Sequence, residues 1–92
     1  MEWNFGKENC IVCGSPYVQI HHVFHGTANR KIADKWGYVI PLCAEHHTGQ
    51  TGVHMNRDQD LYWMRLAQKH FEENYGTRED FIKEFGRSWL NE

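Results

Sequence analysis

Two pairs of metal-binding residue types place the strongest constraint on how this chain can fold. Cys10 and Cys13 form the first pair, Cys43 and His46 form the second, and 29 residues lie between the pairs. Thiolate and imidazole donors at this spacing are typical of a closed tetrahedral zinc site. A redox dithiol at Cys10 and Cys13 is the alternative, but no thioredoxin-like pattern of strand and helix surrounds them. The spacing therefore predicts a structural zinc ion bound by all four residues.

The short chain gives such an ion a clear role. With 92 residues we expect one domain, 1–92, with a zinc-bound core over about 8–56 and a helical tail over about 57–92. A chain of this size buries too little apolar surface to be comfortably stable without a metal or a partner. Bound zinc would supply that stability.

The cysteine count and the apolar pattern bear on where the protein works. Three cysteines, an odd number, argue against a secreted disulfide scaffold. The polar start of the chain does not resemble a signal peptide, and no apolar run is long enough to span a membrane. We therefore expect an intracellular, cytoplasmic protein without a membrane partner.

The formal net charge of -2 is unevenly distributed. Up to Arg57, five Lys and Arg stand against four Asp and Glu, and from Asp58 onward five stand against eight. The zinc-bearing part is therefore near neutral, and the acidity belongs to the tail. Net charge does not predict strong nonspecific adhesion to a polyanion, and the acidic tail favours recruitment by another protein.

Residue patterns predict a small α+β fold. Tyr17–His22 and Tyr38–Ile40 are rich in strand-forming residues, and Gly26–Lys35 between them is interpreted as a polar loop with room for one helical turn. The second strand leads to Cys43, after which Ala44–His47 forms the first turn of a helix. A strand that feeds a cysteine at the start of a helix is typical of a zinc-bound treble clef.

Two further helices are predicted in the tail. Asn56 and Gln59 fit a capping box at the start of the first, which ends at Gly76, and Thr77 and Asp80 fit a second capping box. Apolar residues at helical spacing follow each box, namely Leu61, Met64, Ala67, Phe71 and Tyr75 in the first helix and Phe81, Phe85 and Trp89 in the second. These helices are expected to serve as packing elements.

A second group of candidate ligands consists of histidines. Hydrolysis of a phosphodiester needs an activated water and a cation at the departing oxygen. His21, His47 and His54 can hold a divalent metal ion with coordination positions left open. His22, left unligated, can take a proton from water. Three ligands and one free base account for the four residues.

Two considerations provide other interpretations of these histidines. Adjacent strand residues face opposite ways, so His21 and His22 reach one site only at a strand end or a bulge. A lone histidine is more often a surface or core residue than a ligand, and this is our interpretation of His70. The same interpretation applies to His25, which is the next candidate for the base after His22.

Taken together, these motifs resemble the HNH (ββα-metal) nuclease family in its small, zinc-stabilised phage and prophage form. The residues that carry the resemblance are Cys10-x2-Cys13, Ile20-His21-His22-Val23, Leu42-Cys43-x2-His46-His47 and Gly52-Val53-His54. The resemblance implies a β-hairpin and a helix that grip one metal ion, and metal-dependent DNA cleavage. It gives His22 the place of the general base, His21 and His47 the places of metal ligands, and His54 the place of the closing histidine.

The sequence departs from the family pattern at two places. Tyr38 stands where the central asparagine is expected, and Asn29 is the candidate to replace it, although an asparagine in a polar segment also forms turns. The six residues between His47 and His54 exceed the spacing of a single-helix motif. Three basic residues are candidates for phosphate contact or for an ordinary solvated loop, namely Arg30, Lys31 and Lys35.

Three functions are compatible with these observations. The resemblance favours a phage-derived DNA endonuclease or nickase that uses Mg²⁺, Mn²⁺, Ni²⁺ or Zn²⁺ and leaves a 3′-hydroxyl and a 5′-phosphate. The alternatives are a noncatalytic zinc module that binds nucleic acid and an adaptor that binds proteins through its aromatic tail. Only the nuclease needs His22 in addition to the metal ligands. One metal site makes one nick, so a double-strand cut would need a homodimer or a larger complex.

Overall fold

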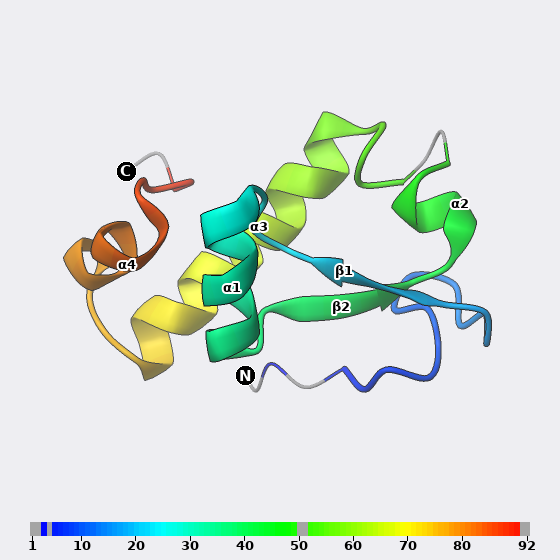
Figure 1. The fold of residues 1–92 in the computed structure, drawn as a ribbon, viewed down its shortest axis with the longest axis horizontal. Helices are drawn as coiled ribbons and strands as arrows, with labels where there is room; N and C mark the ends of the chain where they lie inside the picture. Colours follow the sequence, from blue (N-terminus) through cyan, green and yellow to red (C-terminus); the bar gives the residue numbers. More distant parts are fainter. Residues whose placement is uncertain (1–2, 4, 50–51, 91–92) are drawn as a thin grey trace.

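The computed structural model describes residue 3 and residues 5–49 and 52–90, which form a small α+β fold. Its elements are β1 (Gln19–His22), α1 (Thr27–Trp36), β2 (Val39–Leu42), α2 (Ala44–His47), α3 (Arg57–Asn74) and α4 (Arg78–Phe85). Figure 1 shows α4 and α1 toward one end and α2 at the other, with α3 running diagonally from the α4 end to the middle of the molecule. Within these ranges, no helix combines the length and apolarity that crossing a membrane requires.

The two strands pair antiparallel, as expected for a small α+β core. His21 lies opposite Ile40, and His22 lies opposite Val39. The strand alternation turns the His21 side chain inward, where the residue is 3% exposed, whereas Ile20 is 39% exposed. A two-stranded sheet alone is marginally stable in water, so this one depends on the helices packed around it.

The segment between the strands differs from its prediction. Gly26–Lys35 was expected to be a polar loop, but Thr27–Trp36 is the ten-residue helix α1. Its charged residues are exposed, while Ala33 is fully buried and Ile32 and Trp36 pack against the core. Gly37 ends the helix in the left-handed conformation, with φ 79°. The loop prediction was wrong because it weighed the polar composition above the apolar residues at helical spacing.

The tail helices begin where their capping residues predict. The Asn56 side chain accepts hydrogen bonds from the backbone N–H of Asp58 and Gln59. Thr77 and Asp80 form a complete capping box at the start of α4. The hydrogen bond from the Thr77 backbone lowers the pKa of the Asp80 carboxyl below its ordinary value. The two predicted helices are therefore confirmed, with their starts fixed by side-chain caps.

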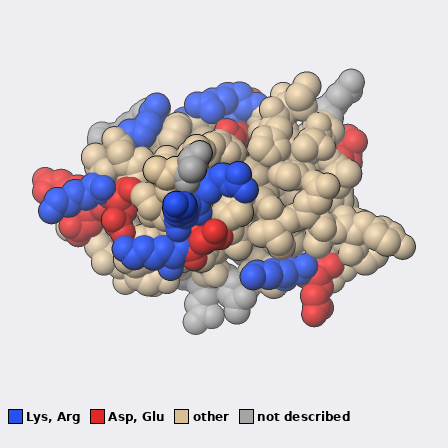
Figure 2. Space-filling view, in the orientation of Figure 1, with Lys and Arg blue, Asp and Glu red and all other residues tan. Residues whose placement is uncertain are grey.

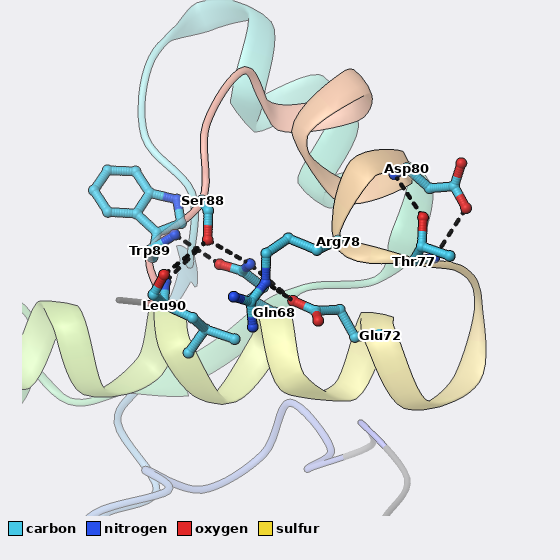
Figure 3. A network of polar contacts seen from close by, with 8 residues as sticks. All are labelled: Gln68, Glu72, Thr77, Arg78, Asp80, Ser88, Trp89 and Leu90. Atoms are coloured by element: carbon cyan, nitrogen blue, oxygen red, sulfur yellow. Dashed lines mark hydrogen bonds and ion pairs between the residues drawn. The ribbon is translucent and has the colours of Figure 1, made fainter. Parts of the chain in front are cut away.

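Helix α4 is shorter than its apolar spacing suggests. It ends at Phe85 because Gly86 has φ 90°, so Trp89 lies beyond the helix. The Trp89 backbone N–H donates to Oε1 of Gln68 at 2.7 Å, and Nε2 of Gln68 donates to Oγ of Ser88 at 2.9 Å. Figure 3 shows this network, which ties the segment after α4 back onto α3.

An aromatic core joins the helical end of the molecule to the sheet. Its members come from the residues flanking the strands and from α3 and α4, and they are Phe24, Tyr38, Phe71, Phe81 and Phe85. Ring centroids of Phe24 and Phe85 lie 4.3 Å apart, and those of Phe71 and Phe81 lie 5.5 Å apart. Burial of each such ring contributes about 1.5–3 kcal/mol. The core thus fixes the segments from which the site residues project.

Candidate metal centre and histidine cavity

The structure brings the two predicted metal-binding pairs together. The donor atoms of Cys10, Cys13, Cys43 and His46 all lie within 4.8 Å of one another. Sγ of Cys13 and Sγ of Cys43 are 3.7 Å apart, and Nδ1 of His46 is 3.7 Å from Sγ of Cys10 and 3.2 Å from Sγ of Cys43. A tetrahedral zinc site needs about 3.8 Å between two sulfurs and about 3.6 Å between sulfur and nitrogen. The four donors therefore fit a closed zinc site.

Local backbone structure positions these donors. Cys10 lies in a tight turn in which its N–H donates to the carbonyl of Ser15 at 2.8 Å and its own carbonyl accepts from Gly14. Cys43 occupies the N-cap of α2, so His46 lies one helical turn further on the same side. Burial raises the pKa of the Cys10 thiol, but hydrogen bonds from backbone N–H groups, including that of Cys43, outweigh burial and lower it to about 6. A thiol that ionises this readily suits a metal ligand.

Five of the seven histidines line one cavity of about 250 Å³. The residues that line it come from β1, the start of α1, α2 and the loop before α3, and they are His21, His22, His25, Gly26, Arg30, His47 and His54. His21 and His22 both line it although they are neighbours in β1. His22 is the last residue of the strand, which is the position at which the alternation of faces can lapse.

The loop after α2 folds back and returns His54 to the cavity. The Val53 N–H donates to the His46 carbonyl at 3.0 Å, and the His54 N–H donates to the His47 carbonyl at 3.2 Å. Gly52 permits this approach, since a Cβ there would lie 2.8 Å from the backbone of His46 and His47. The backbone of Val53 and His54 thus bonds to α2, which brings His54 back beside His47.

Three histidines form a second donor set inside the cavity. The donor atoms of His21, His47 and His54 all lie within 4.8 Å of one another, and the two Nε2 atoms of His47 and His54 are 3.0 Å apart. Nδ1 of His47 donates to Oε1 of Gln19 at 2.5 Å. This bond leaves the lone pair of the ring on Nε2, facing His54. Such outer hydrogen bonds commonly orient metal-binding histidines.

His21 is the most buried of the three. Its Nε2 atom has no hydrogen-bond partner among the described residues. Burial and the neighbouring histidines lower the pKa of His21 to about 3, and burial also lowers the pKa of His47. His21 is therefore neutral at pH 7, as metal coordination requires. An unpartnered buried nitrogen facing two other ring nitrogens fits a bound metal ion.

His22 stands apart from this set and has its own carboxylate partner. Its Nε2 donates to Oδ1 of Asp34 at 2.8 Å, and the two side chains are 21% and 65% exposed. The bond leaves the lone pair of the ring on Nδ1. Asp34 comes from α1, which explains why sequence patterns missed it. Had α1 been predicted as a helix, Asp34 would have stood one turn after Arg30, on the same side.

His25 has a similar partner from the tail. Its Nε2 donates to Oδ1 of Asp60 at 2.7 Å, and Arg57 donates to Oδ2 of the same carboxylate at 3.3 Å. The Asp60 side chain is 9% exposed, although it sits in the first turn of a helix predicted to serve only packing. The 35 residues between His25 and Asp60 explain why no local pattern pointed to this pair.

The remaining predicted site residues are spread around the cavity. Arg30 lines it, and Arg30 and Lys31 flank a shallow depression with His22 and Asp34. Lys35 instead forms an ion pair with Glu84 of α4 at 3.0 Å. Asn29 lies on α1 and does not line the cavity.

Tyr38 and His70 belong to the core. The Tyr38 hydroxyl lies 2.9 Å from Nδ1 of His70, and both residues are buried. Tyr38, which stands at the expected position of the family's asparagine, therefore has a packing role. His70 is a hydrogen-bonded core residue, as it was interpreted from the sequence.

Comparison with known proteins finds no family model, no curated protein and no solved structure that matches this chain.

Proposed function

We propose that this chain is an HNH-type phosphodiester hydrolase with a zinc-bound treble-clef core, which nicks DNA in the presence of a divalent metal ion. One observation carries the proposal. Donor atoms of three imidazoles lie within 4.8 Å of one another, and a fourth histidine, held by a carboxylate, lines the same open cavity. A site with open coordination positions beside a fixed base is suited to hydrolysis rather than to structural support.

The proposed roles of the metal ligands follow from their geometry. His21, His47 and His54 would hold the ion, with Gln19 fixing the ring of His47. A divalent ion held there supplies positive charge that stabilises the oxygen leaving the phosphorus atom. The partly open cavity leaves room for a phosphate group beside these rings.

His22 is the proposed general base. Asp34 accepts the proton on Nε2, so Nδ1 presents its lone pair and can take a proton from a water molecule. The carboxylate also stabilises the imidazolium that forms when this proton arrives. In this proposal Asp34, and not Asn29, performs the orienting task that the family assigns to an asparagine.

Arg30 and Lys31 are the proposed phosphate contacts. Both flank the depression that contains His22, and Figure 2 shows basic side chains gathered over α1 in the middle of the face. The region over the two strands and α2 carries few charged side chains in this view. Arg30 and Lys31 would thus offer local positive charge to a phosphodiester, although the net charge of the whole chain is -2.

The test is a nicking assay on supercoiled plasmid. Protein that retains its zinc is dialysed against a weak chelator, checked for zinc by elemental analysis, and supplied with Mg²⁺, Mn²⁺, Ni²⁺ or Zn²⁺. We expect open-circular product only when a metal is added. Zinc-loaded, folded protein that binds DNA without nicking it under every metal would replace the nuclease proposal with the noncatalytic binding module.

A further inference from the structure

A second set of metal-binding groups lies beside the three cavity histidines. The donor atoms of His21, His25 and Asp60 all lie within 4.8 Å of one another. His21 is 3% exposed and Asp60 is 6% exposed. The unpartnered Nε2 of His21 therefore belongs to a residue that two different donor sets share.

The two sets differ in chemistry. His21, His47 and His54 offer three nitrogens, a donor set suited to borderline ions such as Zn²⁺ and Ni²⁺. His21, His25 and Asp60 offer two nitrogens and a carboxylate, the combination found in sites for ions such as Fe²⁺, and the hard oxygen donor also suits Mn²⁺. A buried carboxylate near an open cavity is costly unless it is paired, and here its pairing groups are His25 and the largely exposed Arg57.

The existing contact between His25 and Asp60 is close to the geometry that an ion requires. Nε2 of His25 and Oδ1 of Asp60 are 2.7 Å apart. Adjacent ligands of a six-coordinate ion, with bonds of about 2.1 Å, lie about 3 Å apart. The pair needs to open by only a few tenths of an ångström, and the proton on Nε2 moves to Nδ1 or to solvent. Arg57 continues to bond the second carboxylate oxygen.

We propose that His21, His25 and Asp60 form a second divalent-metal position, which Mn²⁺ or Fe²⁺ occupies, whereas Zn²⁺ or Ni²⁺ occupies the three-histidine position. The choice of added metal then decides which residues bind it. This inference rests on the proposed function only in taking His21, His47 and His54 as the first metal position. It also gives the helical tail a direct part in the site, because Asp60 belongs to α3.

The test compares two metals on two variants of the zinc-loaded protein. Mn²⁺ binding is followed by the loss of the free-ion signal in electron paramagnetic resonance, and Ni²⁺ binding by calorimetry. We expect Asp60→Asn to weaken Mn²⁺ binding by about tenfold or more and to leave Ni²⁺ binding within about threefold. His54→Ala should show the reverse pattern. Asp58→Asn, an exposed carboxylate in the same helical turn, is the matched control and should change neither.

Two outcomes would overturn the second position. Equal weakening of Mn²⁺ and Ni²⁺ by Asp60→Asn would make Asp60 a positioning residue for a single site, and unchanged Mn²⁺ affinity would remove it from metal binding altogether. If Asp60→Asn does not fold, as judged by circular dichroism and zinc content, His25→Ala provides the same comparison through a side chain that is 41% exposed. The readout is metal affinity, so absence of DNA nicking would contradict the proposed function and leave this result intact.

Discussion

The cysteine cluster and the histidine cavity use similar residue types but are built in opposite ways. The four donors of the cluster, in Cys10, Cys13, Cys43 and His46, come from one turn and the start of α2, and they lie within 4.8 Å of one another. The cavity histidines come from β1, the loop before α1, α2 and the loop before α3. They face a space of about 250 Å³.

This difference leads us to assign fold stability to the cluster and metal binding to the cavity. A closed set of four donors would leave no position for a substrate, so an ion bound there would serve only to hold the fold together. The cavity leaves room beside its ring nitrogens, and one nitrogen of three rings bonds an oxygen, that of Gln19 for His47, Asp34 for His22 and Asp60 for His25. We therefore expect substitutions in the cluster to affect folding and substitutions in the cavity to affect metal binding or catalysis.

The largest effect should come from Cys43→Ala. Structural zinc contributes about 10–16 kcal/mol in small zinc-binding peptides, whereas a whole domain is stable by about 5–15 kcal/mol. Loss of one ligand should therefore leave the chain largely unfolded, as measured by circular dichroism together with zinc content. A folded Cys43→Ala protein that still holds one zinc ion per chain would show that the cluster does not support the fold.

His22→Ala should affect catalysis alone. Loss of a positioned base should lower the rate of nicking by about 10²- to 10⁴-fold, with zinc content, melting temperature and DNA affinity unchanged. The assay uses Ni²⁺ as the added metal, and His25→Ala is the comparison variant. Full activity in His22→Ala together with loss of activity in His25→Ala would move the base to His25.

Acidification should destabilise the cavity through His21. Its pKa is lowered to about 3 in the folded chain, against about 6.5 in an unfolded chain. Between these values the unfolded chain binds a proton that the folded chain does not, so the free energy of unfolding falls as pH falls, by at most about 1.4 kcal/mol per pH unit.

Urea unfolding at pH 7 and pH 5.5, without added cavity metal, measures this effect. The wild type should lose about 1 kcal/mol more than His21→Gln over this interval. Protonation of other groups and loosening of the zinc ligands act on both proteins and cancel in the comparison. Equal losses in both proteins would mean that His21 does not stay neutral in the folded chain.

Gln19→Ala should affect metal binding in the cavity alone. It removes the acceptor that holds Nδ1 of His47, and loss of such outer partners weakens metal binding by about 10- to 100-fold. We expect the lower end for Ni²⁺, measured by calorimetry, because Gln19 is exposed and water can replace it. Gln59→Ala, on an exposed position of α3, is the control. A lower zinc content in Gln19→Ala would show that the cysteine cluster and the histidine cavity are not independent.

The predictable parts of this molecule are those encoded by neighbouring residues. The pairing of Cys10 and Cys13 with Cys43 and His46 could be predicted because each pair occupies a single turn. The starts of α3 and α4 could be predicted because Asn56 and Thr77 cap the backbone within three residues.

The partners of the histidines could not be predicted in this way. Asp34 is 12 residues from His22, and Asp60 is 35 residues from His25, so only the folded chain brings them together. The incorrect prediction of a loop at α1 also hid Asp34. A loop has no regular spacing from which to infer which polar side chain faces a neighbour. The assignment of catalytic roles to these residues remains a prediction from the resemblance and awaits the nicking assay.

A contact between α1 and α4 lies close to the partner of the proposed base. Oε1 of Glu84 accepts hydrogen bonds from Nε1 of Trp36 at 2.9 Å and from Nζ of Lys35 at 3.0 Å. These two bonds tie the last turn of α1 to α4, and Asp34 directly precedes Lys35 in the chain. A small roll of α1 would swing the Asp34 carboxylate away from His22, and proton transfer depends on placement within a fraction of an ångström. A shortened version of the protein that omits α4 would keep every proposed catalytic side chain but would lose these two bonds together with the core residues Phe81 and Phe85.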